Sequence, residues 1–491
     1  MSPSGRFAGL AFIPLSILLS GCVVGPNYSK VKVNAPAVFR GAEATAQQAS
    51  IADLPWWDVF KDADLKGLIQ TSLANNHDLA GVVTRVEQAR QVAAEARSQY
   101  FPAISYNSVI STGQNQFTTS PASNGNGVQG FFLGIALATW EPDLWGRIRR
   151  MNESAMAQYL ATEEGRRGVM LTLVSDVSQA YFELLELKLQ LDIARASAGS
   201  YGESLTLFTQ RLEGGIVSKL ATSRAAAAEA TAAANIPEVE RLIALKENQI
   251  SILLGKNPGL IEVKVKLLDE TIPPEVPSGL PSALLERRPD VLAAEQNVRA
   301  ANAQIGVATA AFFPTVGLTT FLGKVSSPLS EITAGSTNAW SVGANLAGPI
   351  YQGGALRAKK KQAIASWEQA RDQYLQTSLN AFRDVSDALV SREKYDLIRA
   401  EQVRAVRAGE ESVELSLTRF REGLSSYYEV LEAQQQLFPA QSALAQTELN
   451  RRLVIVQLYK ALGGGWNLTD AELMAGQAPA GAVPPPAGKK P

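Results

Sequence analysis

The sequence predicts a mainly α-helical fold that contains two β-hairpins and is built from a duplicated unit. The duplication is visible at residues 288–314, because a similar segment occurs at residues 76–102, at a constant offset of 212 positions. Two other observations support the prediction: very long stretches without proline, and short runs in which large apolar residues alternate with small or polar ones. The period is far longer than the ~20–50 residues of a solenoid repeat. It therefore indicates two halves of one architecture.

Identical residues recur at matched positions of the two halves. At the offset of 212 the pairs are Asp78 and Asp290, Val86 and Val298, Ala89 and Ala301, Ala96 and Ala308, Phe101 and Phe313, and Pro102 and Pro314. Farther along the offset is 208, and the pairs are Arg149 and Arg357, Arg211 and Arg419, Gly215 and Gly423, Ser218 and Ser426, and Leu254-Gly255 and Leu462-Gly463. One small insertion or deletion separates the two offsets.

Composition excludes several classes of function. The 46 Lys and Arg residues balance 47 Asp and Glu residues, which leaves a net charge of −1 and no electrostatic reason to expect nucleic acid as a partner. One His and one Cys in the whole chain are too few for a Cys/His metal centre or a hydrolytic site, since those chemistries need several converging groups. We therefore predict no catalytic residues, no metal site and no cofactor, and a protein that is not an enzyme.

The N-terminus has the features of an export signal. Arg6 precedes an apolar run, residues 7–19, which fits a signal-peptide core and is too short to span a membrane. The run ends in Leu19-Ser20-Gly21-Cys22, which resembles a bacterial lipobox, so residues 1–21 are predicted to be removed and Cys22 to be acylated. The alternative is an ordinary signal peptide with an incidental cysteine. Val23 stands where an inner-membrane retention signal has Asp, which favours the outer membrane, and residues 22–55 are predicted to form a lipid-anchored tether.

Each half is predicted to contain a helix, a hairpin, a long helix, a tight glycine turn and a returning helix. The first repeat covers residues 56–272, the second covers residues 273–466, and a flexible tail follows at 467–491. Residues 147–212 and 355–422 contain no proline, so each predicts a helix of about 100 Å, as in a coiled coil or the wall of a tube. The returning helices are expected at 221–254, with Pro237 at a kink, and at 427–462.

The hairpins are expected at residues 103–140 and 315–350. Their runs alternate with period two, and each can supply the ~9–11 residues of a tilted membrane strand. A soluble sandwich edge would alternate in the same way. Four strands cannot close a barrel in lipid, where open edges are forbidden. Either the strands lie outside a membrane, or several chains share one barrel.

Several motifs resemble one family, the TolC-like outer-membrane efflux channels, in the lipoprotein branch of OprM and NodT. The motifs are Leu284-Leu285-Glu286-Arg287-Arg288-Pro289-Asp290, Ala303-Gln304-Ile305-Gly306-Val307-Ala308, Phe313-Pro314, Asp143-Leu144-Trp145-Gly146-Arg147 and the lipobox. Pro289 and Asp290 also fit the first turn of a helix, and helix initiation is their expected role. The resemblance implies a homotrimer, in which three copies of the four strands close a twelve-stranded membrane barrel and three copies of the helices close a long periplasmic α-helical barrel.

The function implied by the resemblance is passive transport across the outer membrane. The trimer would be the exit duct of a tripartite efflux system, exporting small toxic compounds or drugs from an inner-membrane RND-type pump through a periplasmic adaptor protein, with no cofactor of its own. Two alternatives stay open: a duct for type I polypeptide secretion, and a structural periplasmic lipoprotein without a channel.

The same resemblance implies a periplasmic gate at the glycine turns. Phe420, Glu429 and Glu432 are the candidates for gate and selectivity residues. Glu429 and Glu432 are three positions apart and share one helix face, so a trimer would bring six carboxylates near one axis. They would form a cation-attracting ring at the entrance; the alternative is an ordinary solvated helix face. Phe420 stands where the family often has tyrosine.

Overall fold

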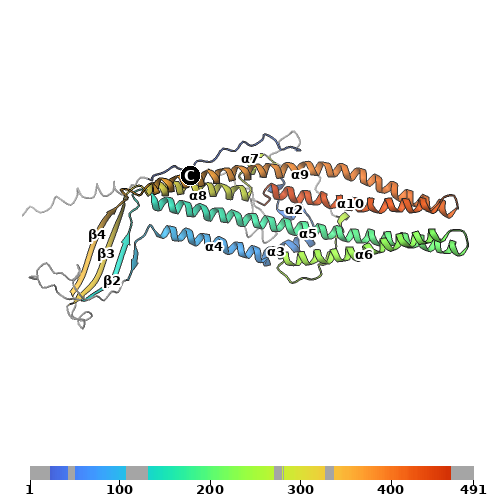
Figure 1. The fold of residues 1–491 in the computed structure, drawn as a ribbon, viewed down its shortest axis with the longest axis horizontal. Helices are drawn as coiled ribbons and strands as arrows, with labels where there is room; N and C mark the ends of the chain where they lie inside the picture. Colours follow the sequence, from blue (N-terminus) through green and yellow to red (C-terminus); the bar gives the residue numbers. More distant parts are fainter. Residues whose placement is uncertain are drawn as a thin grey trace, which may run out of the picture. The chain divides into compact units, whose positions relative to one another are not determined.

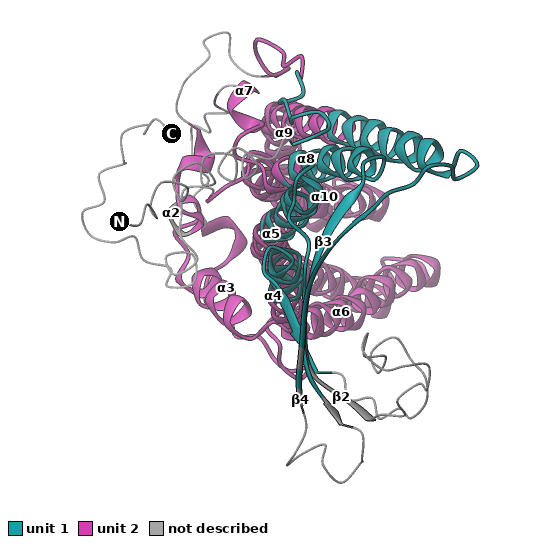
Figure 2. Cartoon of the chain, turned by 90° about the vertical axis from the view of Figure 1, so that its left-hand side faces the viewer, with its two compact units in different colours: residues 1–32, 85–163, 293–375 teal, residues 33–84, 164–292, 376–491 magenta. Residues whose placement is uncertain are grey.

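The computed structural model describes residues 23–41, 50–106, 131–269, 279, 281–326 and 337–465 (Figure 1). The signal peptide, Cys22, residues 107–130 of the first predicted hairpin and the C-terminal tail lie outside the described residues. The chain divides into two compact units (Figure 2). Unit 1 comprises residues 1–32, 85–163 and 293–375, and unit 2 comprises residues 33–84, 164–292 and 376–491. Each unit draws residues from both repeats, so the packing units differ from the repeats read along the sequence.

The main helices reproduce the duplication residue by residue. α4 (His77–Ser98) and α8 (Pro289–Ala310) each have 22 residues and begin 212 positions apart. α5 (Arg147–Glu213) and α9 (Ala355–Arg421) each have 67 residues and begin 208 positions apart. The returning helices, α6 (Lys219–Leu253) and α10 (Tyr427–Ala461), have 35 residues each, again 208 positions apart. The long helices and their returning partners are therefore confirmed.

Shorter helices complete the described part of the chain. They are η1 (Ile51–Asp53), α2 (Trp56–Val59), α3 (Ala63–Asn75), η2 (Leu267–Asp269) and α7 (Pro281–Leu284). Pro237 lies within α6, which continues through it, and α10 likewise contains Pro439. Among the residues that the structure describes, no helix combines the length and the apolar character that crossing a membrane would require.

The strands form one antiparallel sheet in the order β1-β2-β3-β4. They are β1 (Ala103–Ser105), β2 (Phe131–Trp140), β3 (Thr315–Ser326) and β4 (Thr337–Ala347). The β3–β4 pairing confirms the second predicted hairpin, and β1 pairs with the end of β2 as the first hairpin requires. β2 also pairs with β3, with Trp140 opposite Leu318, so the two repeats contribute to a single sheet.

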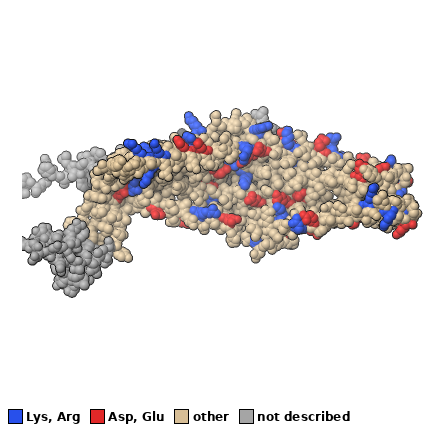
Figure 3. Space-filling model, in the orientation of Figure 1, with Lys and Arg blue, Asp and Glu red and all other residues tan. Residues whose placement is uncertain are grey.

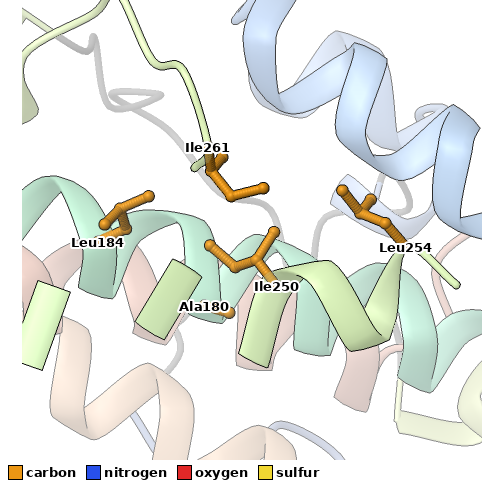
Figure 4. Close-up of a cluster of buried hydrophobic side chains, with 5 residues drawn as sticks. All are labelled: Ala180, Leu184, Ile250, Leu254 and Ile261. Atoms are coloured by element: carbon orange, nitrogen blue, oxygen red, sulfur yellow. The ribbon is translucent and has the colours of Figure 1, made fainter. Parts of the chain in front are cut away.

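The core of unit 2 is built where α5 packs against α6. Ala180 and Leu184 of α5 contact Ile250 of α6 and Leu254 at its C-cap, and Ile261 closes the cluster from the segment after α6 (Figure 4). Leu184 and Ile250 are fully buried. One turn of α5 thus holds the returning helix by apolar burial, a contribution of about 1.5–3 kcal/mol for each large side chain.

Residues 23–41, which follow the predicted lipidation site, form no helix or strand, but hydrogen bonds hold the start of this segment against two helices. In unit 1, the Tyr28 hydroxyl donates to Glu295 (3.0 Å) and the Asn302 amide donates to the Pro26 carbonyl oxygen (3.0 Å). The Arg150 guanidinium donates to the Asn27 side chain (2.7 Å). Hydrogen bonds from α5 and α8 therefore fix the start of the predicted tether.

Candidate functional site

Two glycine turns at the ends of the long helices form the candidate site, and both lie in unit 2. Gly215 and Gly423 have φ angles of +72° and +76°. This is a left-handed backbone conformation, which residues with a Cβ adopt only at a cost in free energy. The N–H of the residue after each glycine donates back to the helix: Ile216 to the Arg211 carbonyl (2.8 Å) and Leu424 to the Arg419 carbonyl (2.8 Å). The matched glycines thus reverse the chain in the same way in both repeats.

A buried aromatic cluster joins the two turns. Its buried members are Phe208, Ala225, Phe420 and Val430. The Phe208 ring lies 4.8 Å from the Phe420 ring and 4.1 Å from the Tyr427 ring, measured between centroids. Phe420, a predicted gate residue, is only 4% exposed. Its ring therefore packs α9 against α5 in this chain and does not present a free surface.

Arg211 links the end of α5 to the end of α9. Its guanidinium donates to the carbonyl oxygens of Phe420 (3.0 Å) and Arg421 (2.9 Å), and it lies 4.4 Å from the centroid of the Phe420 ring. Carbonyl groups at a helix C-terminus lack partners within the helix and carry partial negative charge, so a cation is stabilising there. Arg211 thus acts as a C-terminal cap supplied by the other repeat.

The matched residue Arg419 has different partners. It donates to the Leu424 carbonyl of its own turn (3.3 Å), and its Nε lies 3.8 Å from a carboxylate oxygen of Glu429. The repeat predicted that Arg211 and Arg419 correspond, but the acceptors of Arg211 could not be predicted from residue types, because they are backbone carbonyls, which every residue has.

Glu429 and Glu432 lie on one face of α10, as their spacing predicted. Both are exposed and line a groove of about 530 Å³ between α9 and α10. Glu429 is near Arg419, and Glu432 accepts a hydrogen bond from the Gln436 amide (3.4 Å). Glu411 of α9 lines the same groove and adds a third carboxylate. A position at the axis of a trimer stays a prediction for Glu429 and Glu432.

Two polar side chains of α10 lie near the turns, Tyr427 half-buried and Gln434 fully buried. Burial, together with nearby Tyr201, raises the pKa of Tyr427 to about 12, so its hydroxyl is neutral at physiological pH. The Gln434 amide is buried and donates to the hydroxyls of Ser200 (2.8 Å) and Ser204 (3.1 Å) on α5. These bonds fix the register of α10 against α5 beside the glycine turns.

The first family motif has a structural role. α8 begins at Pro289, as expected for helix initiation. The Arg288 guanidinium donates to Asp290 (2.8 Å), to Asp384 of α9 (2.7 Å) and to the Ala461 carbonyl of α10 (3.3 Å). Burial raises the pKa of Asp384, but hydrogen bonds from Arg288 and Arg383 outweigh that effect, and the pKa is lowered. Arg288 thus joins the start of α8 to α9 and α10 through residues that all lie in unit 2.

The motif Asp143-Leu144-Trp145-Gly146-Arg147 lies in unit 1, at the junction of sheet and helix. Asp143 accepts hydrogen bonds from the N–H groups of Ile148 (3.1 Å) and Arg149 (2.9 Å), so it caps the start of α5. The Trp145 ring stacks on Phe313 at 4.7 Å, and its Nε1–H donates to the Pro314 carbonyl (2.7 Å). Two motifs that are distant in sequence therefore meet where the strands give way to helices.

Comparisons with known proteins agree over nearly the whole chain. A family model described as outer membrane efflux protein matches residues 68–256 and 280–464, one block in each repeat. The toluene efflux pump outer membrane protein TtgC of Pseudomonas putida is 33% identical over 466 residues, 93% of this chain and 95% of that protein. Outer membrane protein OprJ of Pseudomonas aeruginosa is 33% identical over 475 residues, 94% of this chain and 96% of that protein. The solved structure of the outer-membrane channel OprN superposes with a TM-score of 0.83 at 30% identity, over 91% of this chain and all of that one.

Proposed function

The chain belongs to the outer membrane efflux protein family, and from this premise we propose that three copies of it form the exit duct of a tripartite efflux system. The chain is an outer-membrane efflux channel with the fold of the TolC family, and its role is transport. The observation that carries the proposal is the match over more than nine-tenths of the chain to outer-membrane efflux proteins that are themselves covered over 95% or more of their length. We infer that the duct is passive and has no enzymatic activity.

The open edges of the sheet support a trimer. Within the described part of the chain, β1 and β4 each have a neighbour on one side only, and an unpaired strand edge is not tolerated in the hydrocarbon of a membrane. On β4 the large side chains Trp340, Val342 and Leu346 point to one face and are about 70% exposed, while Ser341, Gly343 and Asn345 alternate with them. In the proposed assembly the apolar face contacts lipid, the polar face lines the duct, and three sheets close a twelve-stranded barrel.

The proposed partners follow from the relatives. TtgC is named as the outer membrane protein of a toluene efflux pump, and another relative, SrpC of Pseudomonas putida, as that of a solvent efflux pump. By analogy this chain receives its substrates from an inner-membrane RND-type pump through a periplasmic adaptor. We propose acylation of Cys22 as its additional attachment to the outer membrane.

The relatives also favour one of the sequence-based alternatives over the others. Their names specify toluene, solvents and antibiotics, which are small compounds. Export of small toxic compounds is therefore preferred to type I polypeptide secretion for this chain. A structural lipoprotein without a channel is disfavoured, because the match to the outer-membrane channel OprN covers the whole of that chain.

We propose that the glycine turns form the periplasmic end of the duct and restrict it. Phe420 contributes as the packed ring that joins the two turns, and Glu429 and Glu432 contribute as exposed carboxylates. In a trimer the two carboxylates would be repeated three times around one axis and would attract cations. Water in the duct would keep their mutual repulsion tolerable.

Single-channel recording in planar bilayers tests the proposal. We expect discrete cation-selective openings that depend on the trimer, and reduced cation selectivity and weaker block by divalent ions after Glu429→Gln with Glu432→Gln. The matched control is Glu393→Gln with Glu401→Gln, which removes two exposed carboxylates from α9, away from the turns. A folded, inserted wild-type protein with no conductance would contradict the duct. Equal selectivity in wild type and the Glu429/Glu432 variant would contradict the carboxylate ring but not the duct.

A further inference from the structure

A cluster of basic residues begins α9. Arg357, Lys359, Lys360 and Lys361 lie within its first two turns and are exposed or half-buried. No Asp or Glu occurs from residue 337 to residue 367. Figure 3 shows basic side chains gathered over the start of this helix in unit 1. Within the described residues, none of the four cations has an ion-pair partner. Four uncompensated positive charges therefore share one short stretch of surface.

The first repeat neutralises its cations at the same place. α5 begins with three arginines, and a carboxylate pairs with each of them. The pairs are Arg147 with Glu141 (2.7 Å), Arg149 with Asp143 (3.2 Å) and Arg150 with Glu153 (2.7 Å).

The second repeat has none of these three carboxylates. At the offset of 208 that pairs Arg149 with Arg357, the positions of Glu141, Asp143 and Glu153 are occupied by Pro349, Tyr351 and Lys361. The helix α9 nevertheless begins at the matched residue and has the same length as α5. The helix therefore forms equally well with paired cations, as in α5, and the four unpaired cations of α9 are not needed for the fold. A partner outside the chain is the simplest reason for cations that the chain leaves unpaired.

The basic cluster follows directly after the sheet. β4 ends at Ala347, and the next large side chains, Ile350 and Tyr351, are almost completely exposed. An exposed aromatic residue just after the end of a membrane strand, as Tyr351 is here, followed by Lys and Arg, is typical of the boundary between hydrocarbon and headgroups. The charges would then lie at the depth of the phosphate groups.

The segment that follows the proposed acylation site is held at the same end of the sheet. β2 and β4 both run antiparallel to β3 and both end beside its start, where Trp140 pairs with Leu318 and Ala347 with Thr315. Just after β2, the Trp145 carbonyl accepts a hydrogen bond from the Val24 N–H (3.1 Å). Val24, two residues beyond the predicted acylation site, is thus held at the end of the sheet from which the chain enters α9.

We propose that Arg357, Lys359, Lys360 and Lys361 bind the phosphate groups of anionic phospholipids in the periplasmic leaflet of the outer membrane, with Ile350 and Tyr351 inserted above them. The inference rests on the proposed function, in which the four strands cross that membrane. Each cation near a charged lipid surface contributes about 1 kcal/mol, a factor of roughly five in affinity, and salt weakens the interaction.

The test counts the lipids bound to the purified, detergent-solubilised trimer by native mass spectrometry. The protein is incubated with an equal mixture of phosphatidylglycerol and phosphatidylcholine at low and at high salt. We expect the wild type to retain phosphatidylglycerol preferentially at low salt. The variant with Lys359→Gln, Lys360→Gln and Lys361→Gln should bind it at least about tenfold more weakly. The control with Lys394→Gln, Arg404→Gln and Arg407→Gln removes three exposed charges from the same helix and should retain it.

Three results would overturn the inference: equal binding of the two lipids by the wild type, an equal loss in the variant and its control, or unchanged lipid binding in a variant whose channel selectivity is altered. The last result would assign these lysines to the wall of the duct. Conductance and trimer formation are measured on every preparation, which shows that each variant is folded. A conducting wild-type trimer without lipid preference contradicts only this inference, whereas a wild type that never conducts contradicts the proposed function.

Discussion

Arg211 shows how a duplicated residue can acquire a role that its counterpart lacks. Arg211 bridges from α5 to the last carbonyls of α9, while Arg419, in the matched position, stays within its own turn and beside Glu429. The neighbours explain the difference. Position 208 is Phe, whose ring packs on Phe420, whereas the matched position 416 is Ser. The aromatic pair draws the end of α9 to within reach of the Arg211 guanidinium, and Ser416 cannot form an equivalent pair for Arg419.

We expect Arg211→Ala to loosen the contact between the two turns. The substitution removes two hydrogen bonds from a charged donor, interactions that contribute about 1.5–3 kcal/mol each, less where they are exposed to water. If the turns restrict the duct, the open probability in planar bilayers should rise. Arg419→Ala is the matched comparison and should raise it less, because the hydrogen bond of Arg419 is a 3.3 Å contact within its own turn. A larger effect of Arg419→Ala than of Arg211→Ala would contradict this assignment.

At the scale of single residues, the sequence predicts which side chains share a helix face better than it predicts which side chains touch across helices. The shared face of Glu429 and Glu432 followed from helical spacing alone, and both line one groove. The burial of Phe420 did not, because it depends on Phe208, more than 200 positions away, and the sequence offers no pairing rule for two aromatic rings on different helices. The contacts of Arg211 could not be predicted for a related reason: its acceptors are main-chain oxygens.

At the scale of elements, the glycine turns determine where the two long helices end. In each turn a residue with positive φ lets the next N–H return to the helix end, so α5 stops at Glu213 and α9 at Arg421. The absence of proline and the repeat offset predicted the long helices almost to the residue. The pairing of β2 with β3 could not be predicted, since alternation shows that a strand exists but does not show which strand lies beside it.

We expect Gly215→Ala to destabilise the first turn and Gly214→Ala to be tolerated. Gly215 has a φ of +72°, where a Cβ costs about 1–2 kcal/mol. Gly214 has no such conformation, and a Cβ there would meet atoms only at an ordinary 3.7 Å. Hydrogen exchange of the Ile216 amide, which donates to the Arg211 carbonyl, reports on the turn. Exchange should be about tenfold faster in Gly215→Ala than in Gly214→Ala, a ratio that corresponds to about 1.4 kcal/mol. Equal rates would show that positive φ does not limit this turn.

At the scale of the whole molecule, the central question is what covers the two open edges of the sheet. The polar groups on the free sides of β1 and β4 have no strand partner within the described part of the chain. Because the four strands alternate in direction, β1 of one copy and β4 of the next would be antiparallel, like every other pair in the sheet. The sequence alone posed this closure problem, through strands too few to close, and family membership suggests its solution.

Cysteine cross-linking tests whether β1 and β4 of different copies meet. The chain has one cysteine, Cys22, so introduced pairs would supply the reactive thiols if Cys22 is acylated as proposed. We would place one cysteine at Ser105 on β1 and the other at Ser341, Gly343 or Asn345 on β4 in turn, so that the three positions sample the register between copies. A disulfide needs Cα atoms about 4.4–6.8 Å apart, so only neighbouring strands can form it. At least one pair should give covalent dimers and trimers on a non-reducing gel.

The control pairs Ser105 with Thr319 on β3, which is flanked by β2 and β4 within its own sheet and should not cross-link between copies. Folded variants that never cross-link between β1 and β4 would show that these edges do not meet, and the duct would then need another means of closing its wall.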